Sequence, residues 1–192
     1  MLLLVRHGQT AANAQGLLLG RADPPLSELG RRQAAALAAQ LPGDARVVAS
    51  PLRRTVETAE AFGRRVELDE RWIELDYGAL DGLPLADVPA ELWAAWRADP
   101  AFAPDGGESL AAVGVRVRAA CDALADEARK RDVVVVSHVS PIKAALAWAL
   151  GTGDEVAWRT FVRVASITRV AVGPLGPTLH SFNERCDVDE LP

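Results

Sequence analysis

Three short apolar runs without polar interruptions constrain the fold of this chain more than any other feature. They are residues 2–5 (LLLV), 47–49 (VVA) and 133–136 (VVVV). A strand with one face in water alternates apolar and polar residues, whereas an unbroken apolar run is typical of a strand buried on both faces. Each run is followed by a tight polar turn and then by a helical stretch. Strands that alternate with helices predict an α/β sandwich with a mostly parallel sheet.

Four helical segments have recognisable ends, at about residues 27–40, 50–62, 109–129 and 141–150. A serine stands at the start of the first three, where its side chain is a preferred N-cap. Pro51 and Pro141 suit the first turn of a helix, because the backbone N–H that proline lacks has no partner there. Two late segments, 166–172 and 178–182, flank a turn rich in glycine and proline and are predicted to form a β-hairpin.

Length and composition are those of one compact domain. The chain has 192 residues, of which 49% are hydrophobic and 24% charged, and we expect a single domain over residues 1–192. Residues 77–107 hold many prolines and glycines together with Trp93 and Trp96. We interpret this segment as a lid-like insertion between core elements. The two tryptophans are spaced as on one helix face and are expected to pack within the lid.

Charge and cysteine content exclude several classes of function. The formal net charge is −5, so no chain-wide basic field recruits nucleic acid or a membrane surface. Cys121 and Cys186 lie far apart without a partner motif, which argues against a disulfide scaffold and a cysteine-based zinc site. No apolar run approaches the roughly 20 residues of a membrane span. We therefore expect a cytoplasmic protein, and its oligomeric state stays open.

The polar turns after the three apolar runs bring reactive groups to one edge of the predicted sheet. Ligands of open α/β sheets bind beyond the carboxyl ends of the strands. Here these ends carry Arg6, His7, Arg53, Arg54 and His138. Guanidinium groups match the geometry of phosphate oxygens, and a neutral imidazole is a competent nucleophile. This pattern predicts phosphoryl transfer in which one histidine attacks phosphorus and the other, protonated, stabilises the equatorial oxygens.

A leaving oxygen also needs a proton, and the segment 72–78 (WIELDYG) offers two carboxyl groups. Glu74 is the first candidate for this acid and Asp76 the second. The two histidines and a carboxylate could hold a metal on composition alone, but the neighbouring arginines would repel a cation. We therefore expect neither a metal nor a cofactor at this site.

Several segments, taken in order, carry a family resemblance. They are LVRHGQT at 4–10 with Asn13, DPPLSELG at 23–30, SPLRRT at 50–55, ELDYG at 74–78, GES at 107–109 and VSH at 136–138. Together they closely resemble the motifs of the histidine phosphatase (phosphoglycerate mutase-like) superfamily over nearly the whole chain. The compact length is similar to that of its short α-ribazole phosphatase and broad acid phosphatase members. The resemblance implies a three-layer α/β/α sandwich without a metal requirement.

The resemblance also implies a role for each site residue. His7 matches the phosphorylated nucleophile and Glu74 the proton donor. The remaining phosphate-binding positions match Arg6, Arg54 and His138, with rim contacts at Asn13 and Arg21. Relatives often have glycine after the second histidine, whereas Val139 stands here, and its side chain is expected either to narrow the pocket or to shift the backbone donor at this position. Apart from the resemblance, Lys143 could reach the site, but an exposed helix position is expected.

Taken together, these features favour a metal-independent phosphatase that hydrolyses small phosphomonoesters through a phosphohistidine. One alternative is a phosphoglycerate mutase, which returns the phosphoryl group to a substrate. Mutases that resemble this pattern carry a longer insertion after the acid motif and a longer C-terminal tail. A second alternative is a phosphate-binding module without catalysis. Such a module would lack a catalytic residue, and none is missing here.

Overall fold

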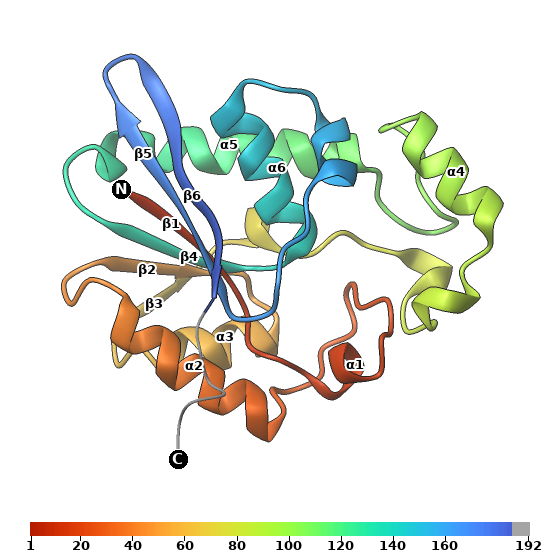
Figure 1. The fold of residues 1–192 in the computed structure, drawn as a ribbon, viewed down its shortest axis with the longest axis horizontal. Helices are drawn as coiled ribbons and strands as arrows, with labels where there is room; N and C mark the ends of the chain where they lie inside the picture. Colours follow the sequence, from red (N-terminus) through yellow and green to blue (C-terminus); the bar gives the residue numbers. More distant parts are fainter. Residues whose placement is uncertain (186–192) are drawn as a thin grey trace.

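The computed structural model describes residues 1–185, which form an α/β fold around a six-stranded sheet (Figure 1). In sheet order the strands are β3 (Val66–Leu68), β2 (Arg46–Ala49), β4 (Val133–Ser137), β1 (Leu2–Arg6), β5 (Ser166–Gly173) and β6 (Gly176–Arg185). The first four pair in parallel, whereas β5 runs antiparallel to both β1 and β6. The three apolar runs are therefore adjacent central strands, and the mostly parallel sheet is confirmed.

Helices cover both faces of the sheet, so the three-layer arrangement is confirmed as well (Figure 1). They are α2 (Glu28–Gln40) and α3 (Arg53–Glu60) on one face, and α5 (Leu110–Ala128) and α6 (Val139–Leu150) on the other. The side chains of β1 show why an unbroken apolar run was needed, because successive residues of a strand point to opposite faces. Leu3 and Val5 pack with α2 and α3, whereas Leu2 and Leu4 pack with α5 and α6.

Serine caps start two of the helices as predicted. The Ser27 hydroxyl accepts a hydrogen bond from Gly30 N (3.0 Å), and the Ser109 hydroxyl accepts one from Ala112 N (3.1 Å). The prediction for α3 was wrong, because this helix begins at Arg53 with Leu52 as its N-cap. Ser50 does not cap it, since the Ser50 hydroxyl lies 2.7 Å from Nε2 of His138. A tertiary partner therefore replaces the local cap.

Two other boundaries differ from the prediction. Helix α6 begins at Val139, two residues before Pro141, so the proline sits within the first turn, where its missing N–H costs nothing. The helix ends as expected, with Gly151 in the left-handed conformation at φ 64°. The strand β3 was missed because Val66–Leu68 is short and incompletely buried, as an edge strand can be. The predicted C-terminal hairpin is confirmed by β5 and β6.

The segment 77–107 leaves the core and returns to the same place. Glu108 N donates to Asp76 O (2.8 Å), which joins the two ends of the excursion. Its largest element is α4 (Ala90–Ala98), and two 3-10 helices, Gly78–Leu80 and Leu85–Asp87, precede it. The remaining short helices of the described chain are α1 (Ala11–Ala14) and the 3-10 helices Glu70–Trp72 and Asp154–Arg159.

Within α4 the Trp93 and Trp96 rings stack with centroids 5.7 Å apart, and Trp96 is buried in the core. The expected packing within the excursion is therefore observed. Cys121 is a buried free thiol, and Cys186 lies outside the described residues. Across residues 1–185, no helix combines the length and apolar character needed to cross a membrane.

Candidate active site

The carboxyl ends of β1, β2 and β4 bring the predicted polar turns together. His7 N donates to Ser137 O (3.1 Å), and Ser50 N donates to Val136 O (3.0 Å), so backbone hydrogen bonds continue past the strand ends. The rings of His7 and His138 are both buried, and their centroids lie 5.2 Å apart. The expected meeting of the two histidines at one sheet edge is thus observed.

His7 is oriented by its own backbone. Its Nδ1 lies 2.7 Å from the Gly8 carbonyl, and because a carbonyl only accepts, the proton of the neutral ring is on Nδ1. A Cβ at residue 8 would lie 2.4 Å from Gly30 O, so only glycine allows this close backbone approach. Burial, followed by the charges of Arg54 and Arg6, holds the pKa of His7 well below 6.5. At neutral pH the Nε2 lone pair is available as a nucleophile.

His138 is fixed between two partners. Arg54 Nε donates to His138 Nδ1 (3.2 Å), so the ring proton is on Nε2 and points to the Ser50 hydroxyl at 2.7 Å. Burial, then the charge of Arg54, holds the pKa of His138 well below 6.5. His138 is therefore neutral in this structure, beside an arginine that supplies positive charge, and its protonation during phosphoryl transfer stays a prediction. A phosphate dianion would favour the protonated ring, because it adds the opposite charge.

Arg54 is buried and held by backbone carbonyls. Its Nη1 and Nη2 donate to Ala22 O (2.7 Å) and Gly20 O (2.8 Å). The same loop is held from the other side by Asp81, whose carboxylate accepts from Gly20 N (2.7 Å) and Ala22 N (2.9 Å). Asp81 therefore positions the loop that orients Arg54, a link that no local pattern indicates. Neighbouring Arg53 instead makes an exposed ion pair with Glu57.

Arg6 approaches from the opposite side of the site. Its Nη1 donates to Val162 O (2.7 Å), which anchors the guanidinium to the segment before β5. Burial lowers the pKa of Arg6 to about 10, so it stays cationic at neutral pH. With buried Arg54, the partly buried Arg6 provides two positive charges beside two neutral imidazoles. Two cations held largely away from water in a chain of net charge −5 favour an anionic ligand.

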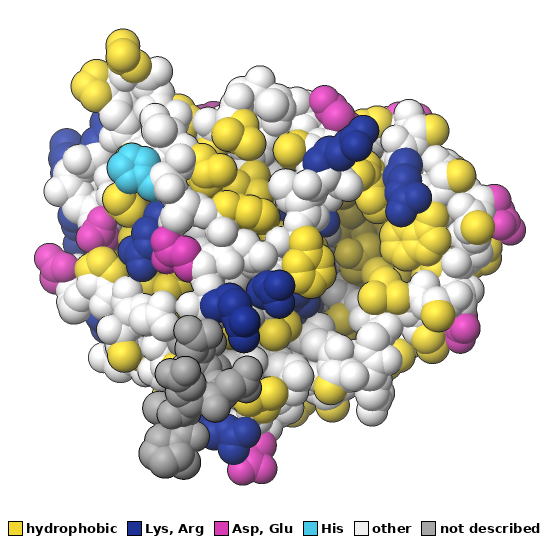
Figure 2. All heavy atoms as spheres, viewed as in Figure 1, with side chains coloured by type: hydrophobic (Ala, Val, Ile, Leu, Met, Phe, Trp, Pro, Cys, Tyr) yellow, Lys and Arg dark blue, Asp and Glu magenta, His cyan; other side chains and the backbone are white. Residues whose placement is uncertain are grey.

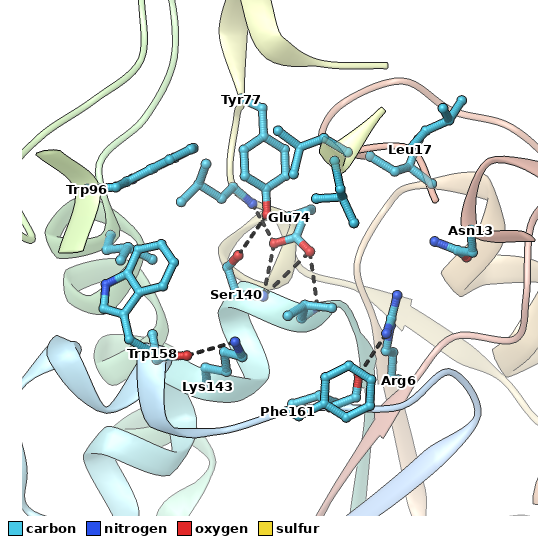
Figure 3. A pocket seen from close by; sticks show the side chains of 18 of the residues that line it. Arg6, Asn13, Leu17, Glu74, Tyr77, Trp96, Ser140, Lys143, Trp158 and Phe161 are labelled. Atoms are coloured by element: carbon cyan, nitrogen blue, oxygen red, sulfur yellow. Dashed lines mark hydrogen bonds between the residues drawn. The ribbon is translucent and has the colours of Figure 1, made fainter. Parts of the chain in front are cut away.

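Glu74 is buried at the N-terminus of α6. Its carboxylate accepts from Leu75 N (2.8 Å), Val139 N (3.0 Å) and Ser140 N (3.1 Å), which fixes its orientation (Figure 3). Residue 139 thus contributes its backbone donor to the acid and also lines the cavity with its side chain. Asp76 plays a local part, since it accepts from Gly78 N (2.9 Å) and is not among the residues that line the cavity.

A cavity of about 290 Å³ opens beside His7 and Glu74. Arg6 and Asn13 line it, and Figure 3 shows the amide nitrogen of Asn13 turned toward its interior. Arg21 does not line this cavity, so its predicted rim contact is not observed. It lies 3.4 Å from the Glu108 carboxylate, which also pairs with Arg116.

Several lining residues were missed or misplaced by the sequence analysis. Lys143, expected to be exposed, is partly buried and donates from Nζ to Ala157 O (2.7 Å). Trp158 and Phe161 also line the cavity, and no sequence motif marks them. Ser50, which contacts His138, was present in a motif but was interpreted as a helix cap. Among residues 1–185, no group of three or more His, Cys, Asp or Glu side chains is placed to hold a metal ion.

Comparison with known proteins places these motifs in a family. The model of the histidine phosphatase superfamily (branch 1) matches residues 2–185. Phosphoserine phosphatase 1 of Hydrogenobacter thermophilus is 35% identical, over 99% of this chain and 95% of that protein. A bifunctional protein of Mycobacterium tuberculosis is 40% identical over 87% of this chain. The match covers 49% of that protein, so the chain spans about half the length of such relatives.

The structure of the mycobacterial glucosyl-3-phosphoglycerate phosphatase complexed with VO3 superposes with a TM-score of 0.85. It is 35% identical, and the match covers 96% of this chain and 98% of the other. The family match and the structural match therefore cover nearly the same part of the chain.

Proposed function

Because the chain belongs to the histidine phosphatase superfamily (branch 1), we propose that it hydrolyses small phosphomonoesters through a phosphohistidine at His7. The observation that carries this proposal is the free Nε2 lone pair of a buried, neutral His7 beside two cationic guanidinium groups. Nucleophile and positive charge are the two requirements of phosphoryl transfer that a protein supplies. Similarity to a phosphoserine phosphatase and a glucosyl-3-phosphoglycerate phosphatase supports a monoester hydrolase.

In the first step, His7 Nε2 donates its electron pair to phosphorus and the ester P–O bond breaks. Arg6, Arg54 and His138 bind the non-bridging oxygens, and Glu74 gives its proton to the departing alkoxide oxygen. In the second step, the Glu74 carboxylate takes a proton from water as the water oxygen attacks phosphorus. The P–N bond breaks, its electron pair returns to His7, and inorganic phosphate leaves.

The protonation of His7 at Nδ1 fits both steps. Attack makes the ring cationic, and the Gly8 carbonyl at 2.7 Å stabilises that charge through the Nδ1–H bond. We also propose that residues 1–192 act as a single domain in which segment 77–107 is a lid over the cavity. Support comes from the joined ends of this segment and from the position of Trp93 and Trp96 in the cavity wall.

Trapping the intermediate tests the proposal. Rapid quenching with a ³²P-labelled ester should give an acid-labile, base-stable label that peptide mapping assigns to His7. The His7→Ala variant should lose at least about 10⁴-fold in turnover, because the nucleophile is gone. Label on a serine, or an active His7→Ala variant, would contradict the mechanism.

Metal independence has its own test. We expect activity to survive dialysis against a strong chelator, since Arg6 and Arg54 supply the charge that a metal would provide. Vanadate should inhibit, because it forms a trigonal bipyramidal mimic of the transferring group. Activity that disappears with the chelator and returns only with a divalent ion would contradict this.

The fate of the phosphoryl group distinguishes the proposed phosphatase from the mutase alternative. A mutase must keep water from its phosphohistidine and bind a bisphosphorylated acid. The one basic residue between Asp76 and Glu108 is Arg97, and its guanidinium lies over the Trp158 ring at 5.6 Å. With 3-phosphoglycerate and a trace of 2,3-bisphosphoglycerate, we expect any turnover to appear as free phosphate. Isomerisation that outruns phosphate release would favour the mutase.

A further inference from the structure

The cavity beside His7 changes character across its width. Arg6 and Asn13 stand on one side, and Trp96 and Trp158 face them from the other (Figure 3). Away from Arg6, His7 and Glu74, the lining is mainly leucine, valine and aromatic side chains. A phosphate held by the polar groups would therefore direct its alcohol part toward an apolar wall. The side chains of this wall therefore influence which alcohol groups the cavity can bind.

The apolar wall is held rigid by contacts among its aromatic rings. Trp93 stacks on Trp96 with centroids 5.7 Å apart, and the edge of Trp158 meets Trp93 at 6.1 Å. Tyr77 packs edge-on against Trp96 at 5.7 Å. These rings come from the excursion 77–107 and from the 3-10 helix Asp154–Arg159. A preorganised aromatic surface binds flat apolar groups with little loss of side-chain entropy.

The mouth of the cavity leaves apolar side chains in water. Phe161 is 67% exposed and Leu85 is 47% exposed, and both line the cavity. Figure 2 shows a hollow on this face whose visible walls are largely hydrophobic. Covering such surface with an apolar ligand is favourable in proportion to the area removed from water. The mouth therefore suits an apolar group better than a hydrated one.

The charged residues of the cavity also favour an uncharged alcohol group. Apart from Arg6 and His7, Lys143 is the single basic residue among the described residues that line the cavity. Its Nζ donates to Ala157 O, and burial lowers its pKa. A ligand with a carboxylate beside its phosphate would need a partner for that second charge. Lys143 already gives one hydrogen bond to Ala157 O, and neither Arg97, over Trp158, nor Arg163, over the Phe161 ring at 5.8 Å, lines the cavity.

We infer that this cavity selects phosphate monoesters whose alcohol is uncharged, flat and apolar, of aromatic-ring size, rather than esters that carry a carboxylate. The inference rests on the proposed phosphatase function and adds to it the class of substrate. The cavity volume of about 290 Å³ lies just below the roughly 300–1,000 Å³ typical of small-molecule sites. That size fits a small aromatic alcohol with its phosphate.

Three esters of primary alcohols test the inference: 2-naphthylmethyl phosphate, O-phosphoserine and glycerol 3-phosphate. Because all three release primary alkoxides, their differences report mainly on binding of the alcohol part. We expect kcat/KM for the naphthylmethyl ester to exceed the other two by at least about tenfold. A kcat/KM for phosphoserine that equals or exceeds it would overturn the inference.

One variant and its control test whether the mouth of the cavity recognises the alcohol group. Phe161→Ala should lower kcat/KM for the naphthylmethyl ester at least about threefold more than for glycerol 3-phosphate. Leu175→Ala is the matched control, since Leu175 is fully exposed at the tip of the β5–β6 hairpin and should leave all three values unchanged. Equal losses on every ester in Phe161→Ala would mean that the mouth does not recognise the alcohol.

Binding separates this inference from the catalytic proposal. In the His7→Ala variant, titration calorimetry should rank the affinities in the same order without turnover. If no ester is hydrolysed but the naphthylmethyl ester binds tightest, the proposed function fails and the substrate class stands. If hydrolysis proceeds and phosphoserine binds as well or better, the substrate class fails and the phosphatase proposal stands.

Discussion

The phosphate side of the site and its alcohol side, which is the apolar wall of the cavity, hold their residues in different ways. On the phosphate side, His7, Arg54, His138 and Glu74 are buried, and each accepts or donates a hydrogen bond with a defined partner. On the alcohol side, the Trp93 and Trp158 rings pack edge to face, and Phe161, 67% exposed, has the Arg163 guanidinium over its ring. Hydrogen bonds are directional, whereas apolar contact depends mainly on area and shape. The phosphate side thus suits fixed chemistry, and the alcohol side suits selection among substrates.

Substitutions on the two sides should therefore affect different kinetic constants. Loss of a group on the phosphate side should lower kcat, because the transition state uses it. Loss of area on the alcohol side should raise KM, because ground state and transition state bind it equally.

After loss of the nucleophile, the largest effect is expected at the acid. Glu74→Gln should lower kcat/KM for an alkyl phosphate by about 10²–10⁴-fold, because the alkoxide needs a proton as it leaves. With p-nitrophenyl phosphate the loss should be at least about tenfold smaller, since nitrophenolate leaves without one. The ratio between the two substrates cancels any general disturbance of the site. Asp76→Asn is the control, and a selective loss there instead would move the acid role to Asp76.

An intermediate effect is expected at Asp81, which holds the loop that orients Arg54. Asp81→Asn loses one of two backbone hydrogen bonds and should lower kcat/KM by roughly tenfold, because Arg54 is less well positioned. In an Arg54→Ala background, the same change should have an effect of less than about twofold. Additive losses in the double variant would show that Asp81 acts independently of Arg54.

A smaller effect, seen in KM, is expected on the alcohol side. Trp158→Leu should raise KM for 2-naphthylmethyl phosphate by roughly five- to tenfold, with kcat within about twofold, because it removes aromatic area from the wall and no group that binds the phosphoryl group. Trp148→Leu is a matched control, since Trp148 bonds to Asp122 and does not line the cavity. A fall in kcat with unchanged KM in Trp158→Leu would erase the distinction between the two sides.

The smallest effect concerns stability and belongs to the phosphate side. Burial holds the pKa of His7 and His138 below 6.5 in the folded chain. Above that pH both residues are neutral in either state, so they do not change the free energy of unfolding. Below it the unfolded chain takes up protons that the folded chain does not, and stability falls until the pH reaches the lowered folded pKa values.

Urea unfolding between about pH 7.5 and about pH 5.5 measures this slope. His138→Gln should flatten it by up to about 1.4 kcal/mol per pH unit within the window, the contribution of one proton. An unchanged slope in this variant would mean that His138 takes up its proton equally in both states.

Local sequence pattern predicted much of the frame. The unbroken apolar runs 2–5, 47–49 and 133–136 became adjacent buried strands, because only burial on both faces accommodates them. Ser27 and Ser109 start their helices as predicted, since capping involves residues three positions apart. His7 and His138 follow strands, and parallel strands necessarily end at the same edge.

Only the tertiary structure decided the contacts between residues that are distant in sequence. Ser50 lies against His138 instead of capping a helix, Arg21 pairs with Glu108 instead of lining the cavity, and Asp81 fixes the loop under Arg54. The aromatic wall joins α4 to Trp158, sixty-odd positions away along the chain. A polar or aromatic side chain can satisfy several local partners almost equally well. Which partner it takes depends on the elements that packing of the core brings within reach.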